Sequence, residues 1–488
     1  MNRAWLPALS LATVLVGVPG PASARGPKAA AEVDMPDRYA GKAGGGPVSR
    51  SPWWRSFSDA SLARMVETGL EANNDVKAAT SRIEEADAVV EQQLSPLLPQ
   101  VTWDTNATMA PTDSLGFQFG GIGGGMGPPP PTLYYTGSSV VNAGVEIDLA
   151  GKQILTRRAS KKDLEAAADD RDLQRRLVVR QITEAYYDVV TAKAQLAVIK
   201  EQIKTNEEVL ELTNFRFRNA QATAVEVLQQ EQQLAATRTL EPPAETQLRV
   251  FQQRLAILMG EAPGTTYPTP DQLPDLPPLP GIGTPDDLLD NRPELRAARE
   301  RLGAADDRRK SANRAFAPTL RVSGQGGVQF FNLTEFDSQW FWNAGVTLSV
   351  PLYTGGRTLA QSRQARASQN TAIHQLNQST LTAVQEVEEA LVREEVQHKA
   401  VEAYEAQLAA AQKAFEESRA RYASGAGDYL TMLSALGAAQ AAEINVINAQ
   451  RQLIGARIQL HDALGDPWRG NISRAEGPAP APAPQGDQ

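Results

Sequence analysis

A long stretch without proline or glycine, from Lys152 to about Asn219, constrains the fold of this chain more than any other feature. Its apolar residues recur at alternating intervals of four and three, the heptad spacing that is typical of coiled-coil packing. A helix of this length would measure about 100 Å, which is too long for a compact globular domain. The predicted seam consists of Val178, Ile182, Ala185, Val189, Ala192, Leu196, Ile199, Ile203, Leu210 and Phe217.

A return helix follows this stretch and completes a helical hairpin. After a brief break around residues 219–221, the helical pattern resumes over about 223–259. Pro242 and Pro243 predict a kink or a break in the return helix, because proline removes a backbone donor and clashes with the preceding turn. A proline-dense linker then covers residues 261–285.

The second half of the chain restates the first, which is strong evidence for an internal duplication. The segment before the strands repeats at an offset of 219, and the hairpin repeats without a gap at an offset of 205. A second long helix is therefore predicted over about 356–424, followed by a glycine-rich turn and a final helix over 428–464. Matched pairs include Asp75 with Glu294, Pro99 with Pro318, Ile182 with Val387, Leu228 with Leu433 and Gly260 with Gly465.

Each copy also carries two segments in which apolar and polar residues alternate, the pattern of a β-strand with two different faces. The first strand pair falls within 100–149 and has a long glycine- and proline-rich loop from Pro111 to Thr132. The second pair falls within 318–351 and has a short loop. Alternation places Trp340, Trp342, Val346 and Leu348 on one face, and Phe341, Asn343, Thr347 and Ser349 on the other.

The two ends of the chain are predicted to differ from the duplicated body. Arg3, a short apolar stretch and the small residues Ala22-Ser23-Ala24 have the pattern of an export signal. Repeat 1 begins with a helix that Asp59 can cap and that Pro96 and Pro99 end. The predicted organisation is a signal peptide (1–24), an extended arm (25–58), repeat 1 (59–260), the linker (261–285), repeat 2 (286–465) and a disordered proline- and alanine-rich tail (466–488).

Four strands with two open edges make a poor isolated sheet. Closing the sheet with strands from other subunits would pair those edges and turn the apolar face toward lipid. After the signal, no segment has the ~18 uninterrupted apolar residues of a membrane-spanning helix. An aromatic girdle at the loop ends of the strands is predicted from Tyr134, Tyr135, Phe330, Phe331, Trp340 and Trp342. The alternative is a small soluble sheet with scattered aromatic residues.

Several short motifs resemble those of the TolC-type outer membrane factors, the outer membrane efflux protein family. The resemblance covers nearly the whole mature chain, and the order and spacing of the motifs carry it, since no single motif is decisive. The motifs are Trp53-Trp54 with Phe57 and Asp59, Asp148-Leu149-x-Gly151-Lys152, Pro351-Leu352-Tyr353-x-Gly355-Gly356-Arg357, Arg421-Tyr422-x-x-Gly425 and Tyr429-Leu430-Thr431-x-Leu433.

This resemblance implies a mainly α fold with a transmembrane β-barrel. Four strands per chain would make one twelve-stranded barrel in a homotrimer, continued by a long α-helical coiled-coil tunnel with an internal two-fold repeat. The implied function is an exit duct in the bacterial outer membrane, with the tunnel in the periplasm, for efflux or type I secretion. Implied partners are a periplasmic adaptor (membrane fusion) protein, an inner-membrane pump of RND or ABC type and outer membrane lipid. Nucleic acid is not expected as a partner, because the net charge is −9 and phosphate binding needs a basic surface.

The resemblance further implies that the tunnel closes near the turn of the second hairpin. Leu430 matches an apolar gate position, while Thr431 and Ser434 stand where relatives often carry aspartate. Asp428 is the nearest carboxylate. Its three copies could repel one another, bind cations and tune opening, or Asp428 could simply cap the last helix, and the two roles are compatible. Adaptor docking at the hairpin tips is predicted from Arg421, Tyr422, Gly425, Gly427, Phe217 and Asn219.

We find no catalytic constellation in the sequence. The chain has three histidines and no cysteine, which removes disulfides, thiolate metal sites and cysteine nucleophiles. His398 lies near Glu394 and Glu395, but one histidine with two carboxylates is more typical of a solvated helix face than of a metal site. No enzyme activity, metal or cofactor is therefore predicted. The rival function is an exported structural coiled coil or adhesin-like protein without a channel.

Overall fold

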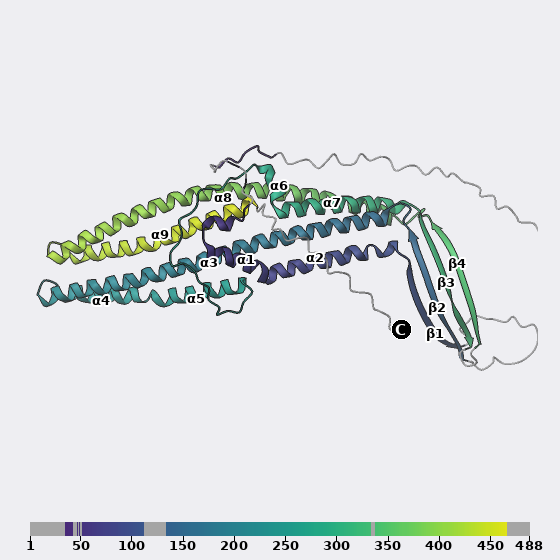
Figure 1. The fold of residues 1–488 in the computed structure, drawn as a ribbon, viewed down its shortest axis with the longest axis horizontal. Helices are drawn as coiled ribbons and strands as arrows, with labels where there is room; N and C mark the ends of the chain where they lie inside the picture. Colours follow the sequence, from purple (N-terminus) through teal and green to yellow (C-terminus); the bar gives the residue numbers. More distant parts are fainter. Residues whose placement is uncertain are drawn as a thin grey trace, which may run out of the picture. The chain divides into compact units, whose positions relative to one another are not determined.

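The computed structural model of the protein describes residues 35–41, 46, 48, 51–111, 133–332 and 337–465, which all belong to one compact unit. The predicted signal peptide, the glycine- and proline-rich loop from 112 to 132 and the predicted tail lie outside these residues, so they remain predictions. Within the described residues, the fold consists of two copies of a helix, an antiparallel strand pair and a long helical hairpin (Figure 1).

The helices and strands follow the predicted order in both copies. The first copy comprises η1 (Trp53–Phe57), α1 (Ala60–Ala72), α2 (Asn74–Gln92), η2 (Ser95–Leu97), β1 (Gln100–Pro111), β2 (Leu133–Ile147), α3 (Lys152–Arg218), α4 (Ala224–Arg238) and α5 (Glu241–Leu258). The second comprises η4 (Pro285–Asp287), α6 (Leu288–Asn291), α7 (Pro293–Asn313), η5 (Arg314–Phe316), β3 (Thr319–Asn332), β4 (Asp337–Ser349), α8 (Arg357–Ser424) and α9 (Tyr429–Leu464). The two long helices have 67 and 68 residues, so each copy contains the predicted long helix of a hairpin.

Two helices, α1 and α2, replace the single helix predicted to start at Asp59. Asp59 caps α1 as predicted, because its carboxylate accepts hydrogen bonds from the amides of Ser61 and Leu62. At Asn73 the backbone becomes extended, and its side chain caps α2 by accepting a hydrogen bond from the amide of Asp75 at 2.8 Å. The prediction of one helix was wrong because the asparagine side chain competes for backbone donors at this position.

Residues 53–57 fold into η1 and do not continue the predicted extended arm. Trp53, Trp54 and Phe57 are all buried. The rings of Trp53 and Trp54 meet edge to face with their centroids 6.0 Å apart, and both belong to the largest apolar cluster. Burying such large rings removes much apolar area from water, which stabilises the turn against the helices. The predicted arm is therefore wrong over these residues.

The return helix of the first hairpin breaks at the predicted prolines. Its first part, α4, ends at Arg238, and α5 starts at Glu241 with Pro242 in its first turn. Proline is tolerated there because the amides of the first turn need no intrahelical partner. The corresponding helix of the second copy, α9, continues unbroken for 36 residues.

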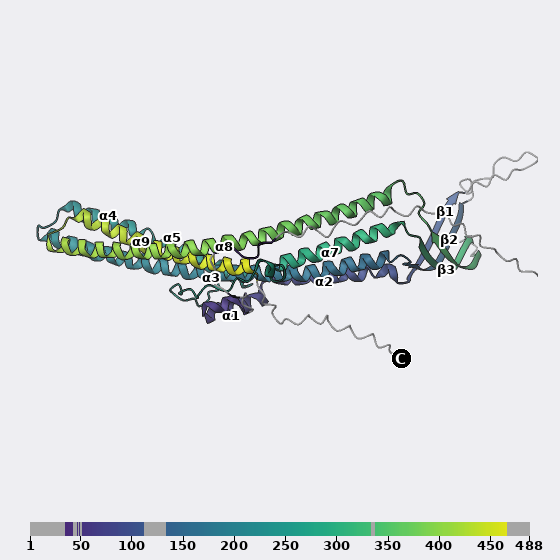
Figure 2. The same ribbon diagram turned by 90° about the horizontal axis from the view of Figure 1, so that it is seen from above.

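The largest apolar cluster joins the two copies at the middle of α3. Figure 2 shows α3 and α9 running together past α1. The predicted seam residues Val178, Ile182, Ala185 and Val189 are buried in this cluster. Other members come from α1, α5 and α9, namely Leu62, Met65, Val66, Leu255, Ile454 and Ile458.

The four strands form one antiparallel sheet in the order β1-β2-β3-β4. The copies meet at its centre, where β2 pairs with β3. Gly327 of β3 lies very close to β2, since a Cβ at this glycine would be 2.2 Å from the carbonyl oxygen of Ser139. The outer strands, β1 and β4, are the two edges of the sheet.

Among the helices that the structure describes, one, α9, is long and apolar enough to cross a membrane by length and composition alone. Its most apolar window reaches a mean hydropathy of 1.3, although polar residues interrupt it. The helix packs along α8 and α3, and its small residues Ala439, Ala442 and Ala449 are buried. Close packing in the hairpin therefore explains its alanine-rich composition.

Candidate functional site

The first hairpin turns between α3 and α4. Asn219 ends α3, and its side-chain amide donates a hydrogen bond to the carbonyl oxygen of Phe215 at 2.8 Å. Thr223 and Glu226 form a capping box that starts α4. Phe217 and Asn219, two of the predicted docking residues, are exposed at this turn.

The second hairpin turns through Gly425, Ala426 and Gly427. Gly425 has a φ of 80°, a left-handed conformation that favours glycine at the end of a helix. Gly427 approaches the preceding helix so closely that a Cβ would lie 2.9 Å from the Cβ of Arg421. Both glycines are thus explained by the turn itself, and their part in docking remains a prediction.

Asp428 caps α9, which confirms the structural role considered for it. Its carboxylate accepts hydrogen bonds from the amide of Thr431 at 3.1 Å and from the hydroxyl of the same residue at 3.3 Å. Leu430, Thr431 and Ser434 are exposed, whereas the neighbouring Tyr429 is buried. The structure therefore brings Asp428 and Thr431 together, and the gate role of these four exposed residues remains a prediction.

Tyr422 differs from the other predicted docking residues because it is only 2% exposed. Its hydroxyl donates a hydrogen bond to Oε2 of Glu226 at 2.8 Å, and the guanidinium carbon of Arg216 lies 4.2 Å from its ring centroid. Burial, supported by the hydrogen bond to Glu226, raises the pKa of Tyr422 to about 12, so the hydroxyl stays a donor at neutral pH. Tyr422 thus fastens the second hairpin to the first and offers no docking surface.

A second buried tyrosine makes a parallel link between the hairpins. The Tyr429 hydroxyl donates to Oε1 of Gln230 at 3.1 Å, and Nε2 of Gln230 donates to Oδ1 of Asn206 at 3.1 Å. Burial raises the pKa of Tyr429 to about 12 as well. The ring centroids of Tyr422 and Tyr429 lie 5.8 Å apart. We call Asn206, Arg216, Glu226, Gln230, Tyr422 and Tyr429 the tip lock.

Apart from Tyr422, the residues of the tip lock were not predicted as site residues from the sequence. In the part of α3 that leads to the hairpin turn, the predicted seam residues Ile203, Leu210 and Phe217 are only half-buried or exposed. The buried stripe consists of Ile199, Gln202, Asn206, Val209, Thr213 and Arg216. The seam prediction was wrong here because it admitted only apolar residues, whereas the buried residues are largely polar and hydrogen-bonded. These residues recur at intervals of three and four, and this spacing could have identified them as one buried face of the helix.

The two faces of the sheet differ in polarity, as the alternation predicts. Strand pairing places Trp103, Val141, Gly326 and Trp342 in one row, and directly paired side chains share a face. Trp103 and Trp342 are 75% and 74% exposed. On the opposite face, Asp104 accepts hydrogen bonds from the side chains of Asn142 and Thr102 at 2.8 and 3.0 Å. Trp103 was not among the predicted girdle residues, although it lies in one row with Trp342.

The predicted girdle residues lie on β2, β3 and β4. Trp340 is 70% exposed, and Phe330 is half-buried. The side chains of Tyr134, Tyr135 and Phe331 lie outside the described residues, so the girdle as a whole remains a prediction.

The histidines and carboxylates do not gather into a site. His398 is 3.4 Å from Glu402 on the same exposed helix face, while Glu394 forms a buried ion pair with Arg457 at 2.5 Å. Within the ranges that the structure describes, no three His, Asp or Glu side chains are grouped to hold a metal ion.

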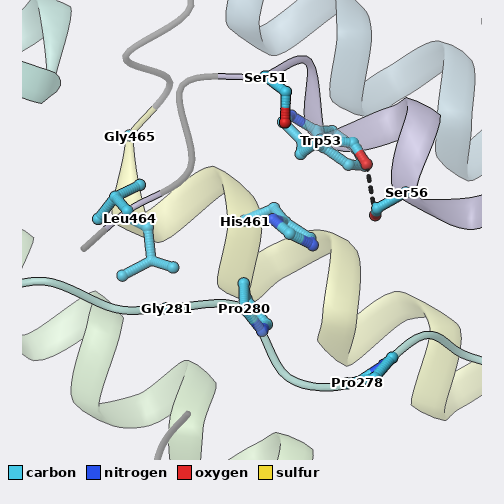
Figure 3. Close-up of a pocket in the computed structure, with 10 residues that line it drawn as sticks. Ser51, Trp53, Ser56, Pro278, Pro280, Gly281, His461, Leu464 and Gly465 are labelled. Atoms are coloured by element: carbon cyan, nitrogen blue, oxygen red, sulfur yellow. Dashed lines mark hydrogen bonds between the residues drawn. The ribbon is translucent and has the colours of Figure 1, made fainter. Parts of the chain in front are cut away.

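A small cavity lies beside η1 and the end of α9 (Figure 3). Its volume is about 170 Å³, and Trp53, His461 and Pro280 are among its lining residues. The rings of Trp53 and His461 stack with their centroids 5.2 Å apart. The cavity contains none of the predicted gate, docking or girdle residues.

Acidification is expected to destabilise the fold through His461. Burial, aided by Arg457, lowers its pKa from 6.5 to about 3. Between these values the unfolded chain binds a proton that the folded chain does not, so stability falls as the pH drops, by up to about 1.4 kcal/mol per pH unit. His461→Phe keeps a ring against Trp53 and should flatten this dependence when thermal unfolding is followed against pH. His374→Phe, at an exposed position, is the control. An unchanged pH dependence in H461F would contradict the assignment.

The sequence of each copy matches a known protein family. The sequence model of the family described as "Outer membrane efflux protein" matches residues 66–261 and 284–466, one segment in each copy. These two segments cover well over half of the chain.

Similar proteins and structures extend over nearly the same length. The pyoverdine export outer membrane protein OpmQ of Pseudomonas aeruginosa is 26% identical over 86% of this chain and 87% of its own. The outer membrane protein OprJ of the same species is 27% identical over 85% of this chain and 86% of its own. The structure of the outer-membrane channel OprN superposes with a TM-score of 0.76, at 24% identity, over 89% of this chain and 98% of that one. The Campylobacter jejuni CmeC channel gives 0.74 at 22% identity, over 86% and 89%.

Proposed function

The chain belongs to the outer membrane efflux protein family, and from this premise we propose that it forms the exit duct of a tripartite efflux assembly. It is an outer-membrane channel, and its family implies a trimer within efflux pumps. In the proposed assembly the duct conducts its cargo passively, after docking to a periplasmic adaptor protein and an inner-membrane pump.

The observation that carries this proposal is the sheet with two unlike faces and two free edges. One face exposes Trp103, Trp340 and Trp342, and the other is polar around Asp104 and Asn142. A sheet of this kind gains most stability when further strands pair with its edges and close it into a barrel. The aromatic face then lies toward lipid and the polar face toward water. A structural coiled coil without a channel has no use for such a sheet.

The tips supply the surface that we assign to the adaptor. Arg421, Phe217 and Asn219 are exposed there, beside the gate candidates Asp428 and Leu430. The curated relatives include proteins named for pyoverdine export and for antibiotic and toluene efflux pumps. These names support small organic molecules over secreted proteins as the cargo, with an RND or ABC pump supplying the energy.

Reconstitution tests the proposed channel directly. The protein extracted from outer membranes in detergent is expected to run as a trimer and to produce discrete conductance steps in planar lipid bilayers. A gene deletion is expected to sensitise cells to small toxic molecules and to leave protein export intact. A monomer that is soluble without detergent and produces no conductance would overturn the channel proposal.

Two substitutions at Asp428 separate its cap from its predicted role in the gate. Asp428→Ala should weaken the start of α9 by about 1 kcal/mol, whereas Asp428→Asn should leave it nearly unchanged, because asparagine caps helices equally well. If the carboxylate tunes opening, D428N retains the thermal stability of the natural protein but loses sensitivity of its conductance to Mg²⁺. Equal Mg²⁺ responses in D428N and the natural protein would remove Asp428 from the gate and leave it as a cap.

A further inference from the structure

We propose that two stripes of side chains, one at the start of α3 and one at the start of α8, bind anionic phospholipid headgroups of the membrane leaflet that faces the helices. The stripes belong to the outer-membrane channel of the proposed function, on which this inference rests. We call them the basic stripes, and they consist of Ile154, Arg158 and Lys161 on α3 and of Leu359, Arg363 and Arg366 on α8.

The internal duplication makes the two stripes equivalent. Adding 205 to positions 154, 158 and 161 gives 359, 363 and 366. Each stripe has an apolar residue at i and cations at i+4 and i+7, a spacing that places all three side chains on one face of a helix. Two further cations of α3, Arg157 and Lys162, are replaced in α8 by Ser362 and Ala367. Over residues 152–162, and after the first residue of the helix, the recurring cations are therefore those on the face of the apolar residue.

The basic stripes are open to their surroundings. Ile154 and Leu359 are 51% and 49% exposed, and the four cations are also exposed. Helix α3 packs against α2 and against α7 of the same chain, yet its stripe stays uncovered. The stripe therefore faces either the outer surface or the tunnel. A large apolar side chain gains free energy against lipid and none in a water-filled tunnel, so Ile154 favours the outer surface.

The positive charge of the stripes is largely uncompensated. Nε of Arg158 lies 3.6 Å from Oδ2 of Asp307, an oxygen that Nζ of Lys162 approaches at 3.2 Å. The other three cations of the stripes have no ionic partner in the part of the chain that the structure describes. The sequence from 338 to 385, which contains the stripe of α8, has no aspartate or glutamate. On a chain with a net charge of −9, this end of the helices is thus locally basic.

The position of the stripes matches the headgroup region of a bilayer. β2 ends at Ile147 and β4 at Ser349, so each stripe begins within ten residues of a strand that the proposed function places in the membrane. The cations follow the apolar residue by about 6 and 10 Å along the helix axis. Helical side chains lean toward the N-terminus, which is the sheet end of both α3 and α8. The long cationic side chains can therefore reach back toward the headgroups.

The chemistry of the stripes selects the class of lipid. Guanidinium and ammonium groups bind phosphate oxygens through charge-assisted hydrogen bonds. A zwitterionic headgroup offers the same phosphate but brings its own cation, whereas phosphatidylglycerol and cardiolipin carry net negative charge. Each basic residue beside an anionic bilayer strengthens binding about fivefold. The apolar residue of each stripe can contact the acyl chains next to the headgroup.

Lipid binding to the purified trimer tests the stripes. The quadruple variant Arg158→Gln, Lys161→Gln, Arg363→Gln and Arg366→Gln is compared with the natural protein in detergent. Native mass spectrometry follows titration with cardiolipin or with phosphatidylcholine. The natural trimer is expected to prefer cardiolipin by about tenfold or more, and the quadruple variant is expected to lose most of this preference. The matched control removes four exposed cations farther along the hairpins and should keep it, namely Lys204→Gln, Arg238→Gln, Lys399→Gln and Lys413→Gln.

A single cysteine tests which surface the stripes face, because the chain has no cysteine of its own. A fluorophore on Leu359→Cys is expected to be quenched by nitroxide-bearing lipids after reconstitution into vesicles of phosphatidylethanolamine and phosphatidylglycerol. The same fluorophore on Lys413→Cys, far from the sheet along α8, should not be quenched by these lipids.

The outcomes separate this inference from the proposed function. Equal cardiolipin preference in the quadruple variant and the natural protein would overturn the inference, as would an equal loss in the matched control. A label at position 359 that only a water-soluble quencher reaches would place the stripe in the tunnel and also overturn it. Trimers with normal conductance in any of these cases leave the exit duct standing. A chain that forms neither trimers nor channels would overturn the proposed function itself.

Discussion

Replacing Tyr422 and Tyr429 together with phenylalanine is expected to raise the mean conductance of the channel by releasing the second hairpin from the first. Each substitution keeps the buried ring and removes one hydroxyl, so Glu226 and Gln230 lose their donors in the tip lock. A hydrogen bond to a charged partner contributes about 1.5–3 kcal/mol, and one between neutral partners about 0.5–1.5 kcal/mol. The hydrogen-bond free energy lost per chain is large enough to shift an equilibrium between closed and open tips more than tenfold, since about 1.4 kcal/mol corresponds to a factor of ten.

The control for the tip lock is Tyr404→Phe, because Tyr404 lies on the same helix as Tyr422 and is 39% exposed. Single-channel recording should show longer openings for the double variant and unchanged openings for Y404F. Cells that carry the double variant should also admit large polar antibiotics that the natural channel excludes. Identical gating in the double variant and the natural protein would show that the tip lock is structural and takes no part in opening.

Introducing valine at Gly327 is expected to prevent assembly of the channel. A Cβ at this position would lie 2.2 Å from the carbonyl oxygen of Ser139 and 2.7 Å from the Cα of Val140, so the backbone of β2 would have to move. Overpacking of this kind costs about 1–3 kcal/mol or more, and here it falls at the junction between the two halves of the sheet. The amount of folded trimer in the outer membrane, measured on gels without heating, is expected to fall to a small fraction of normal.

The matched control for Gly327 is Gly345→Val on β4. Strand pairing places both glycines on the polar face of the sheet, but a Cβ at Gly345 meets nothing within 4 Å. Valine is also favoured in strands. G345V is therefore expected to assemble normally. Normal assembly of G327V would show that β2 can move away from β3 without loss of the barrel.

Much of this architecture could be predicted from residue order, because its causes are local or repeated. The heptads that follow Val178 predict a helix too long for a globular domain, and alternation around Trp342 predicts two-faced strands. The offsets of 219 and 205 require two equivalent units whatever their packing. The prolines at 242 and 243 predict the break in the return helix, because a missing amide acts within one turn.

The pairing of residues within the tip lock could not be predicted in this way. Hydrogen bonds such as that from Tyr422 to Glu226 join residues 196 positions apart. The sequence does not show which distant polar side chain will be the partner of a given one. Gln230 is stable in the interior because it donates to Asn206 within the first hairpin and accepts from Tyr429 of the second, and the second bond forms only when the hairpins pack together. The heptads, the alternating strands and the duplication therefore determined the long hairpins and the paired strands from the sequence alone. The packing of one hairpin on the other decided which residues hold the tips together, because that choice depends on distances in space.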